Sequence, residues 1–416
     1  MLWAGAFVAG CGGSPTEITS SSSGQCPVAA ATLELPQLPE PAGCFRYGWT
    51  KQLSGSGTLA AVASDGTIAA LSLQDGVRQV TVLDRMGQQL GSFPIEPYGD
   101  LLRIFPGGEV VAATRTGQLA RFDMRGTALA KLDFGHPIED LAATPSGLLL
   151  VSWQGEGGAA GLSEHGVVAA FSRDGTLHWS TTIEYETAPA LAVSPDGSLL
   201  ATGRATSALG SLTAFSILLD LNGQEVTRHT LSVSAAHPAG PLFVRSAFMG
   251  RVALQELSAW PNAGSWPATV DVDPSDSVSE LTLHSNAPDF LTASDLAGAS
   301  CWARSFRPLD ESNHARLVSF AANARGAVID VNGDVYKVHH IMRLSAAGTV
   351  RWRYDRPNDG MMNDVLLAGI DARDLVVLSG RFEGTQDFDP GPAIDARTAT
   401  VESRRYITAL FDCDHD

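Results

Sequence analysis

Two short segments of the chain place alternating aspartates just before a proline. They read TVDVDPSD and TQDFDPG, and their aspartates are Asp271, Asp273 and Asp276 in the first and Asp387 and Asp389 in the second. Carboxylates spaced in this way on an exposed loop can supply the hard oxygen ligands that Ca²⁺ requires. Alternatively, each aspartate accepts hydrogen bonds from its own turn, which aspartate commonly does beside proline and glycine. Because the proline interrupts the D-x-D-x-D-G order of an EF-hand loop, we favour the turn and keep calcium as the alternative.

Other groups that could do chemistry are sparse, and we assign no catalytic residues. His339 and His340 are adjacent on a predicted strand, so their side chains point to opposite faces and cannot hold one metal ion together. The sequence contains no G-x-S-x-G elbow, no P-loop and no H-E-x-x-H motif.

The hydrophobic pattern predicts an all-β chain built from repeats. Short Val, Leu, Thr and Phe runs alternate with DG, NG, RG and PG turns. Six hairpins share a D/S-x-x-G turn, and a second hairpin precedes each of them. The turn glycines are Gly87, Gly126, Gly175, Gly223, Gly298 and Gly348. Two hairpins every ~40–50 residues make a four-stranded unit, which is the unit of a β-propeller blade.

The two ends of the chain each supply half of a further blade. The C-terminal segment RRYITALFDCDHD is a third strand without a fourth, whereas Cys44 to Leu53 is a fourth strand without a third. We therefore predict a seven-bladed β-propeller of four-stranded antiparallel blades over residues 44–416, with the ring closed by the N-terminal strand. A solenoid or an eight-bladed ring is the alternative geometry. Closure would bring Cys44 near Cys413 and predicts a disulfide between them.

The N-terminal segment indicates export and anchoring. An apolar run from Leu2 to Gly10 precedes Cys11 and is far shorter than the ~20 residues that span a bilayer. The segment resembles a bacterial lipoprotein signal with its lipobox, although no basic residue precedes the run. Either the true start lies upstream, or the segment is only an apolar N-terminus. The resemblance implies a signal peptide at 1–10, lipidation of Cys11 and a flexible Ser/Pro-rich tether at 11–43. Gly12 after the cysteine implies the outer membrane of the cell envelope, on its periplasmic or surface face.

Four further cysteines remain, namely Cys26, Cys44, Cys301 and Cys413. An even number in an envelope protein permits two disulfides, with three possible connectivities. No pair has the C-x-x-C spacing of a zinc or redox site.

The two aspartate segments also carry a family resemblance. Residues Gly380 to Gly391, and more loosely Gly264 to Trp302, resemble units of the bacterial seven-bladed β-propeller repeat, which run G-x-F-x-G-T-x-D-F-D-P-G. The resemblance covers about a quarter of the chain. It implies a propeller of the envelope or cell surface and implies no activity.

Tryptophan recurs at one position of the outer hairpins, in Trp49, Trp179, Trp302 and Trp352. The quinone-cofactor propellers bear tryptophan in a similar place, where it is a structural staple between blades. The resemblance therefore implies packing residues and no cofactor site.

The net charge and the composition of the predicted inner strands limit the classes of function. The net charge of −17, from 28 Lys and Arg against 45 Asp and Glu, argues against nucleic acid and leaves membrane contact to the anchor. The predicted innermost strands are small and apolar, with Arg103 the lone clear cation. We favour a monomeric, non-enzymatic module that binds an envelope protein or polymer at one face of the ring, enlarged by insertions in blades three, five and seven. The propeller lipoprotein of the outer-membrane barrel-assembly machinery has a similar architecture, by fold analogy alone. The alternative is a propeller enzyme, namely a quinone-dependent dehydrogenase, lyase or hydrolase, with its site at the central channel.

Overall fold

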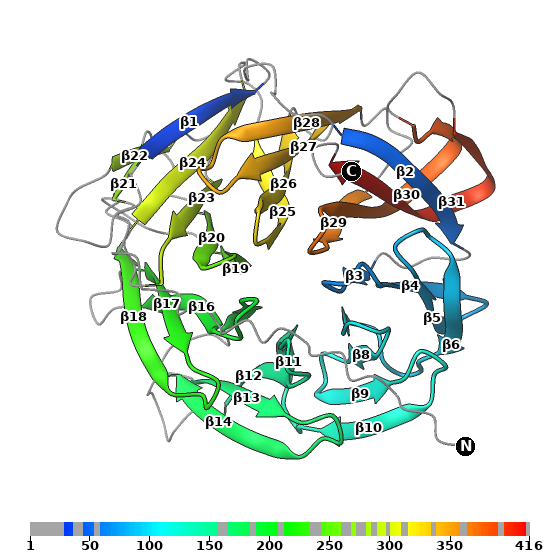
Figure 1. Ribbon diagram of the computed structural model, residues 1–416, viewed down its shortest axis with the longest axis horizontal. Helices are drawn as coiled ribbons and strands as arrows, with labels where there is room; N and C mark the ends of the chain where they lie inside the picture. Colours follow the sequence, from blue (N-terminus) through cyan, green and yellow to red (C-terminus); the bar gives the residue numbers. More distant parts are fainter. Residues whose placement is uncertain are drawn as a thin grey trace, which may run out of the picture.

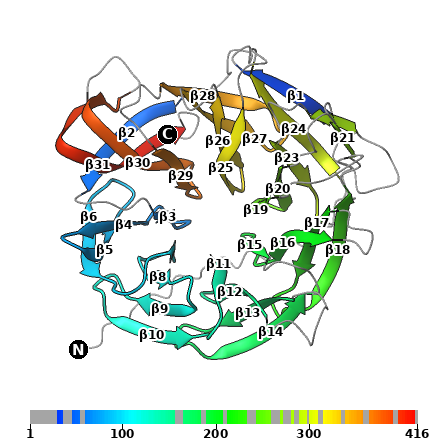
Figure 2. The same cartoon turned by 180° about the vertical axis from the view of Figure 1, so that it is seen from behind.

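The structure is a ring of β-strands. The computed structural model describes residues 29–35, 45–53, 59–155, 165–183, 189–206, 212–232, 243–258, 268–271, 280–283, 289–296, 300–308, 315–333, 338–357, 364–389 and 395–412. Within these ranges every regular element is a strand, from β1 to β31. Figures 1 and 2 show the strands as seven blades around a central axis, with the first strand of each blade innermost. The predicted all-β, seven-bladed β-propeller is confirmed.

The first four blades are antiparallel sheets of consecutive strands. Blade 1 consists of β3 (Ala60–Val62), β4 (Ile68–Gln74), β5 (Val77–Leu83) and β6 (Gln89–Pro94). Blade 2 consists of β7 (Leu101–Ile104), β8 (Val110–Ala113), β9 (Gln118–Phe122) and β10 (Ala128–Asp133). Blade 3 consists of β11 (Ile138–Ala143), β12 (Leu149–Gln154), β13 (Gly166–Phe171) and β14 (Leu177–Ile183). Blade 4 consists of β15 (Ala190–Val193), β16 (Leu199–Thr206), β17 (Leu212–Leu219) and β18 (Glu225–Ser232).

The other three blades carry the additions to this plan. Blade 5 consists of β19 (Phe243–Met249), β20 (Val252–Ser258), β23 (Asp289–Ser294) and β24 (Ser300–Pro308), and between β20 and β23 lies a small hairpin of β21 (Ala268–Asp271) and β22 (Glu280–Leu283). Blade 6 consists of β25 (Arg316–Asn323), β26 (Gly326–Gly333), β27 (Val338–Ser345) and β28 (Val350–Pro357). Blade 7 consists of β29 (Asp364–Ile370), β30 (Leu375–Asp387), β31 (Ala396–Asp412) and the N-terminal β2 (Phe45–Leu53).

Blade 7 closes the ring as predicted. Strand β2 pairs antiparallel with β31, with Phe45 opposite Asp412 and Leu53 opposite Arg405. The sheet order β2-β31-β30-β29 therefore joins both ends of the chain in one blade. Cys44 and Cys413 directly flank the Phe45 and Asp412 pair in the sequence but lie outside the described residues.

Part of the predicted tether is a strand. Strand β1 (Ala29–Leu35) pairs parallel with β24, with Ala29 opposite Trp302 and Leu35 opposite Pro308. The expectation of a flexible tether over all of residues 11–43 is thus wrong for this stretch. Its physical reason is the outer edge of blade 5, whose unpaired backbone N–H and C=O groups are a template for an added strand. Sequence patterning gave no sign of this because β1 contributes a single strand with no hairpin partner.

The turns between third and fourth strands follow the D/S-x-x-G pattern. In blade 1, Oδ1 of Asp84 accepts hydrogen bonds from the N–H groups of Met86 (2.9 Å) and Gln88 (2.8 Å). Gly87 has φ of 77°, which costs other residues about 1–2 kcal/mol. Asp123 and Asp220 repeat the arrangement, and the backbone N–H groups of Thr127 and Gln224 hold the pKa values of these two carboxyls below their usual range.

The tryptophans hold adjacent blades together, as the resemblance implied. Trp49 lies over Gly87 of the next blade, where a β-carbon would come within 2.6 Å of the ring, and its Nε1 donates to the carbonyl of Arg85 (3.0 Å). Trp179 lies over Gly223 and Trp302 over Gly348 in the same way, each donating to a carbonyl of the facing turn. Trp352 faces the blade that lacks this turn. Its Nε1 instead donates to Asp412 Oδ2 (3.3 Å).

Apolar side chains fill the space between blades. At the closure, Ile68 and Leu83 of blade 1 pack in one cluster with Leu375, Val377 and Phe411 of blade 7. Similar clusters join the other neighbours, because each blade exposes an apolar face that only the next blade can cover.

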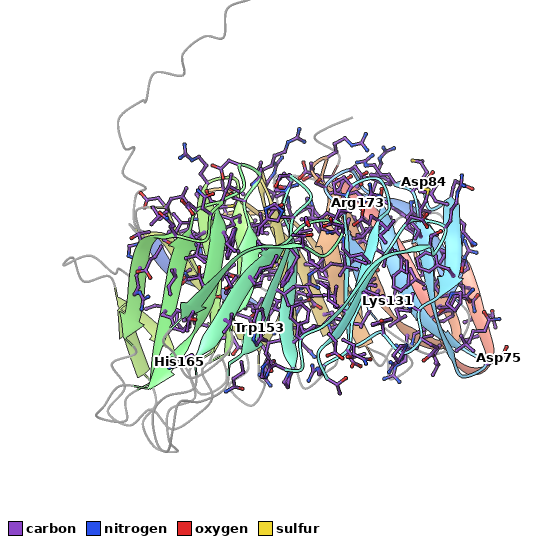
Figure 3. All side chains as sticks on the ribbon, turned by 90° about the horizontal axis from the view of Figure 1, so that it is seen from below. Asp75, Asp84, Lys131, Trp153, His165 and Arg173 are labelled. Atoms are coloured by element: carbon purple, nitrogen blue, oxygen red, sulfur yellow. The ribbon has the colours of Figure 1, made fainter. Side chains whose placement is uncertain are left out.

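The ring has two different ends. Turns between first and second strands and between third and fourth strands lie at one end, which we call the turn end; Asp84 and Arg173 mark it in Figure 3. Connections between second and third strands and between blades lie at the other, which we call the loop end; Asp75 and His165 mark it in Figure 3. The insertions of blades 3, 5 and 7 all connect a second strand to a third, so they start and finish at the loop end.

Candidate functional site

A cavity of about 630 Å³ lies on the ring axis, lined by residues from the innermost strand of every blade and the turns that follow them. Its wall is mostly small and apolar, with residues such as Ala63, Ala142, Ala192, Ala247 and Ala322. Arg103 is the only charged residue in the described part of the wall, and that part contains no carboxylate, histidine or cysteine. The prediction that Arg103 is the lone cation of the innermost strands is wrong, because β19 and β25 carry Arg245 and Arg316, which do not line the cavity. This wall can hold a ligand but offers little acid, base or nucleophile chemistry.

Arg103 itself is engaged in linking blades. Its Nη2 donates to Oδ1 of Asp140 (2.7 Å) and its Nε to the carbonyl of Leu141 (2.6 Å), both on blade 3. The second oxygen of Asp140 accepts the N–H of Leu191 (2.8 Å) on blade 4. The charge of Arg103 is therefore balanced by Asp140, and the two side chains together link blades 2, 3 and 4.

The segment TQDFDPG is the tip of a hairpin that extends blade 7. Oδ1 of Asp387 accepts the N–H groups of Asp389 (3.1 Å) and Asp395 (2.9 Å), which is the turn-capping role that the sequence favoured. Between the aspartates, Phe388 is 1 % exposed and packs with Phe382 and Tyr406, at ring-centre distances of 5.1 and 4.7 Å. The segment thus stabilises its own hairpin.

For calcium, the structure locates two of the five proposed ligands together. Asp387 and Asp389 share the turn just described. Asp271 is the last residue of β21, and Asp273 and Asp276 lie outside the described residues. No cluster of three His, Cys, Asp or Glu side chains with metal-binding geometry occurs among the residues that the structure describes. Calcium binding by these aspartates stays a prediction.

A polar clip that the sequence analysis missed fastens this hairpin to the N-terminal strand. Tyr47 of β2 donates its hydroxyl hydrogen bond to Oδ2 of Asp395, and Oδ1 of Asp395 lies 2.6 Å from Nε of Arg397. Burial and the Asp395 carboxylate raise the pKa of Tyr47. These residues lie far apart in the sequence, so only the β2–β31 pairing could have brought them together.

A second group that sequence reasoning missed lies between blades 5 and 6. Glu256 is 2 % exposed, and its Oε2 lies 3.0 Å from Nε of Arg245. Beside it, Oδ2 of Asp289 accepts the N–H of Leu317 (2.9 Å) and lies 3.7 Å from Nε of Arg316. Burial raises the pKa of Glu256 to about 7, and the Asp289 charge adds to the rise while Arg245 and Arg316 oppose it. A carboxyl that titrates near neutrality can exchange protons at physiological pH.

The histidine pair divides as predicted. Nδ1 of His339 lies 2.9 Å from Oδ1 of Asp330 on β26, whereas Nδ1 of His340 lies 2.8 Å from Oδ1 of Asp355 on β28. Burial raises the pKa of Asp330, which has no exposed surface. Each ring therefore has its own carboxylate, and the pair forms no joint metal site.

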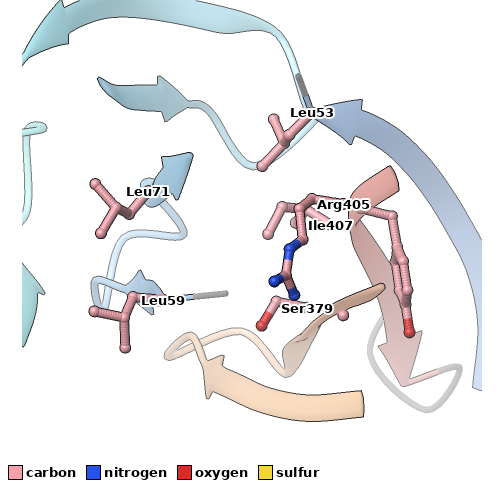
Figure 4. A pocket seen from close by; sticks show the side chains of 8 residues that line it. Leu53, Leu59, Leu71, Ser379, Arg405 and Ile407 are labelled. Carbon is pink, nitrogen blue, oxygen red and sulfur yellow. The ribbon is translucent and has the colours of Figure 1, made fainter. Parts of the chain in front are cut away.

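A smaller gap lies between blades 7 and 1 (Figure 4). It has a volume of about 10 Å³ and is lined by Leu53, Leu59, Leu71, Ser379, Gly380, Arg405, Tyr406 and Ile407. That volume holds about one water molecule, so the gap is a packing defect beside the closure and not a ligand site.

Cysteine chemistry is visible at one position. Cys301, on β24, is 5 % exposed and disulfide-bonded. Cys11, Cys26, Cys44 and Cys413 all lie outside the described residues, so the predicted lipidation and the Cys44–Cys413 bond stay predictions. No helix in the described ranges is long and apolar enough to cross a membrane.

Comparisons with known proteins find distant structural likenesses only. No family model matches the chain, and no characterised protein matches it in sequence. Among solved structures it is similar to BamB from Moraxella catarrhalis, with 15 % identity over 90 % of this chain and 99 % of that one, and a TM-score of 0.44. It is also similar to polysaccharide lyase Uly1, with 9 % identity over 90 % and 94 % of the two chains and a TM-score of 0.48. The propeller of Dos1 is a third, with 10 % identity over 88 % and 95 % and a TM-score of 0.40.

Proposed function

We propose that this β-propeller is a lipid-anchored envelope protein that binds a protein or polymer without catalysis. The observation that carries the proposal is the axial cavity, whose described wall is small and apolar and whose one cation, Arg103, is balanced by Asp140. A closed ring of this kind is a rigid support, and a rigid support that presents loops is how propellers bind partners.

The disulfide at Cys301 supports the envelope location. Disulfides persist in oxidising compartments such as the bacterial periplasm and the cell surface, and are rare in the cytosol. An envelope location also agrees with the lipobox-like segment that ends at Cys11. Both features support a location outside the cytoplasm.

The loop end is the proposed binding face. The insertions of blades 3, 5 and 7 all start and finish there, and blade 7 adds the rigid hairpin closed by Asp387 and Phe388. Because Tyr47 and Asp395 tie this hairpin to β2, it projects a fixed surface.

Crosslinking in intact envelopes tests the proposal. The wild-type chain and a Cys11→Ser variant are expressed at equal levels, and crosslinked partners are identified by mass spectrometry. We expect a stoichiometric partner whose crosslinks map to the loop end, and its loss in the variant that cannot be lipidated. Absence of any partner at every crosslinker length would remove the main support for a binding module.

One observation favours an enzyme as the second candidate. Glu256, with a pKa of about 7, is suited to proton transfer, although it lies between blades 5 and 6 and not in the cavity wall. A quinone-dependent dehydrogenase, lyase or hydrolase using it would lose at least about 100-fold in turnover on Glu256→Gln, the usual contribution of a general acid or base. Turnover of polysaccharide and alcohol substrates by the wild type and by Glu256→Gln decides whether Glu256 is catalytic.

A further inference from the structure

Exposed apolar side chains gather at the turn end. Seven large hydrophobic residues are exposed in the described part of the chain, and five of them lie at this end. They are Met86 (61 %) and Leu221 (52 %) at the tips of turns, and Leu90 (45 %), Leu177 (53 %) and Val226 (61 %) at the start of outer strands. The other two, Leu73 and Val77, flank one short turn at the loop end. Single exposed apolar residues need no explanation, but five of seven at one end, on blades 1, 3 and 4, suggest that this end meets an apolar layer.

The direction of β1 independently points to the same end. Strand β24 follows the third-to-fourth connection of blade 5, so it starts at the turn end. Because β1 runs parallel to it with Ala29 opposite Trp302, the chain enters β1 from the turn end. The segment before Ala29 contains Cys11, so the proposed anchor joins the ring on the side where the apolar tips lie.

Exposed charged groups of both signs lie at the turn end, with aspartates such as Asp65 and Asp174 beside arginines. Arg173 and Arg251 have side chains 67 % and 82 % exposed, although each also meets a carboxylate, Glu109 at 2.8 Å and Asp196 at 3.8 Å respectively. Asp84, by contrast, turns Oδ1 toward the N–H groups of its own turn. Apolar tips with exposed arginines beside them can lie in the interface of a bilayer, and the zwitterionic lipids of that layer also tolerate the neighbouring aspartates.

We propose that the turn end lies against a lipid surface, with Met86, Leu90, Leu177, Leu221 and Val226 at the headgroup boundary and the loop end directed away. The inference rests on the proposed anchoring at Cys11 and deepens it, because an anchor alone would leave the ring free to tumble. In this orientation the loop end, where the acidic insertions start and finish, faces away from the lipids.

Photocrosslinking to lipid tests this orientation. The lipidated full chain is placed in phosphatidylethanolamine and phosphatidylglycerol vesicles that contain a photoactivatable phospholipid, and crosslinked peptides are mapped by mass spectrometry. We expect lipid adducts in residues 84–90, 173–179 and 220–226. A Met86→Asp and Leu221→Asp double variant should lose about fivefold or more of these adducts, whereas Leu73→Asp at the loop end should lose none. Thermal melting confirms that all variants are folded.

The outcomes separate the orientation from the anchor. If Cys11→Ser abolishes vesicle attachment and the attached wild type is labelled around Leu73 and Val77 instead, the anchor stands and the orientation is overturned. If the wild type is not lipidated, the same photocrosslinking is done with the unlipidated chain at high lipid concentration. Lipid adducts at the turn end then support the proposed orientation, and their absence overturns it. Crosslinking of the same turn peptides to a protein in native envelopes, in place of lipid, also overturns it.

Discussion

At the scale of single residues, Glu256 makes a pH-dependent contribution to stability. Its pKa in the folded protein, about 7, lies above the ordinary value of 4.5, so the folded state binds the proton more tightly. Stability from this group is therefore fully present below pH 4.5 and is lost as the pH rises through 7, by up to about 3 kcal/mol. In Glu256→Gln this loss should vanish, so the variant gains on the wild type between pH 5 and 8 in urea unfolding.

A matched control for this experiment is Glu225→Gln. Glu225 is an exposed partner of Arg228, which lowers the pKa of its carboxyl, so its titration falls below pH 5. The unfolding free energy of this variant should run parallel to that of the wild type from pH 5 to 8. Parallel curves for Glu256→Gln as well would mean that Glu256 is ionised at neutral pH like any surface glutamate.

Substitutions of Asp387 distinguish a structural turn from a calcium site. Replacement by alanine removes the acceptor for two backbone N–H groups and should cost about 0.5–2 kcal/mol, whereas asparagine keeps that acceptor and should cost less. Added Ca²⁺ should change neither the melting temperature of the wild type nor that of Asp387→Asn. A calcium-dependent rise in the wild type alone would establish the metal site and reject a purely structural turn.

At the scale of elements, the tryptophan staples predict a contrast between glycines. Gly223 and Gly107 have similar φ values, 76° and 84°, so alanine strains both backbones alike. At Gly223 the new methyl group would overlap the Trp179 ring, whereas at Gly107 nothing lies within 4 Å. Gly107→Ala should cost about 1–2 kcal/mol, and Gly223→Ala should cost about 1–3 kcal/mol more from overpacking. Equal losses in chemical denaturation would show that the staple is not rigid.

The closing strands make a prediction about disulfides. Because Phe45 pairs with Asp412, the next residues in each strand direction are Cys44 and Cys413. Cys301 is bonded, and β1 begins at Ala29 beside Trp302, which favours Cys26 as its partner. Non-reducing peptide mapping should find a Cys44–Cys413 bond and a Cys26–Cys301 bond. A double variant with Cys44→Ser and Cys413→Ser should lose about 4 kcal/mol of unfolding free energy. A Cys44–Cys301 peptide would contradict this pairing.

At the scale of the whole molecule, the repeat carried most of the prediction. Turn glycines such as Gly87 and Gly223 are required locally, because each has φ above zero and lies beneath a tryptophan. Their spacing along the sequence therefore predicted the blades, including the seventh blade that is split between the chain ends. What escaped prediction depends on contacts between distant segments. Strand β1 follows from an open edge on blade 5, the Tyr47–Asp395 clip from ring closure, and the raised pKa of Glu256 from burial between two blades. None of these leaves a local pattern, whereas Arg103 was identified because a charge among small apolar residues is visible in one strand.

The central claim is that the ring is a non-catalytic support whose loop end binds a partner in the envelope. The most direct measurement is the distribution of partner crosslinks over the ring, obtained from intact envelopes with the lipidated chain. The account predicts that they concentrate at the loop end, including the hairpin around Asp387, and that Glu256→Gln leaves them unchanged. Crosslinks concentrated at the turn end, or a chain that turns over a substrate in a Glu256-dependent way without a stable partner, would contradict it.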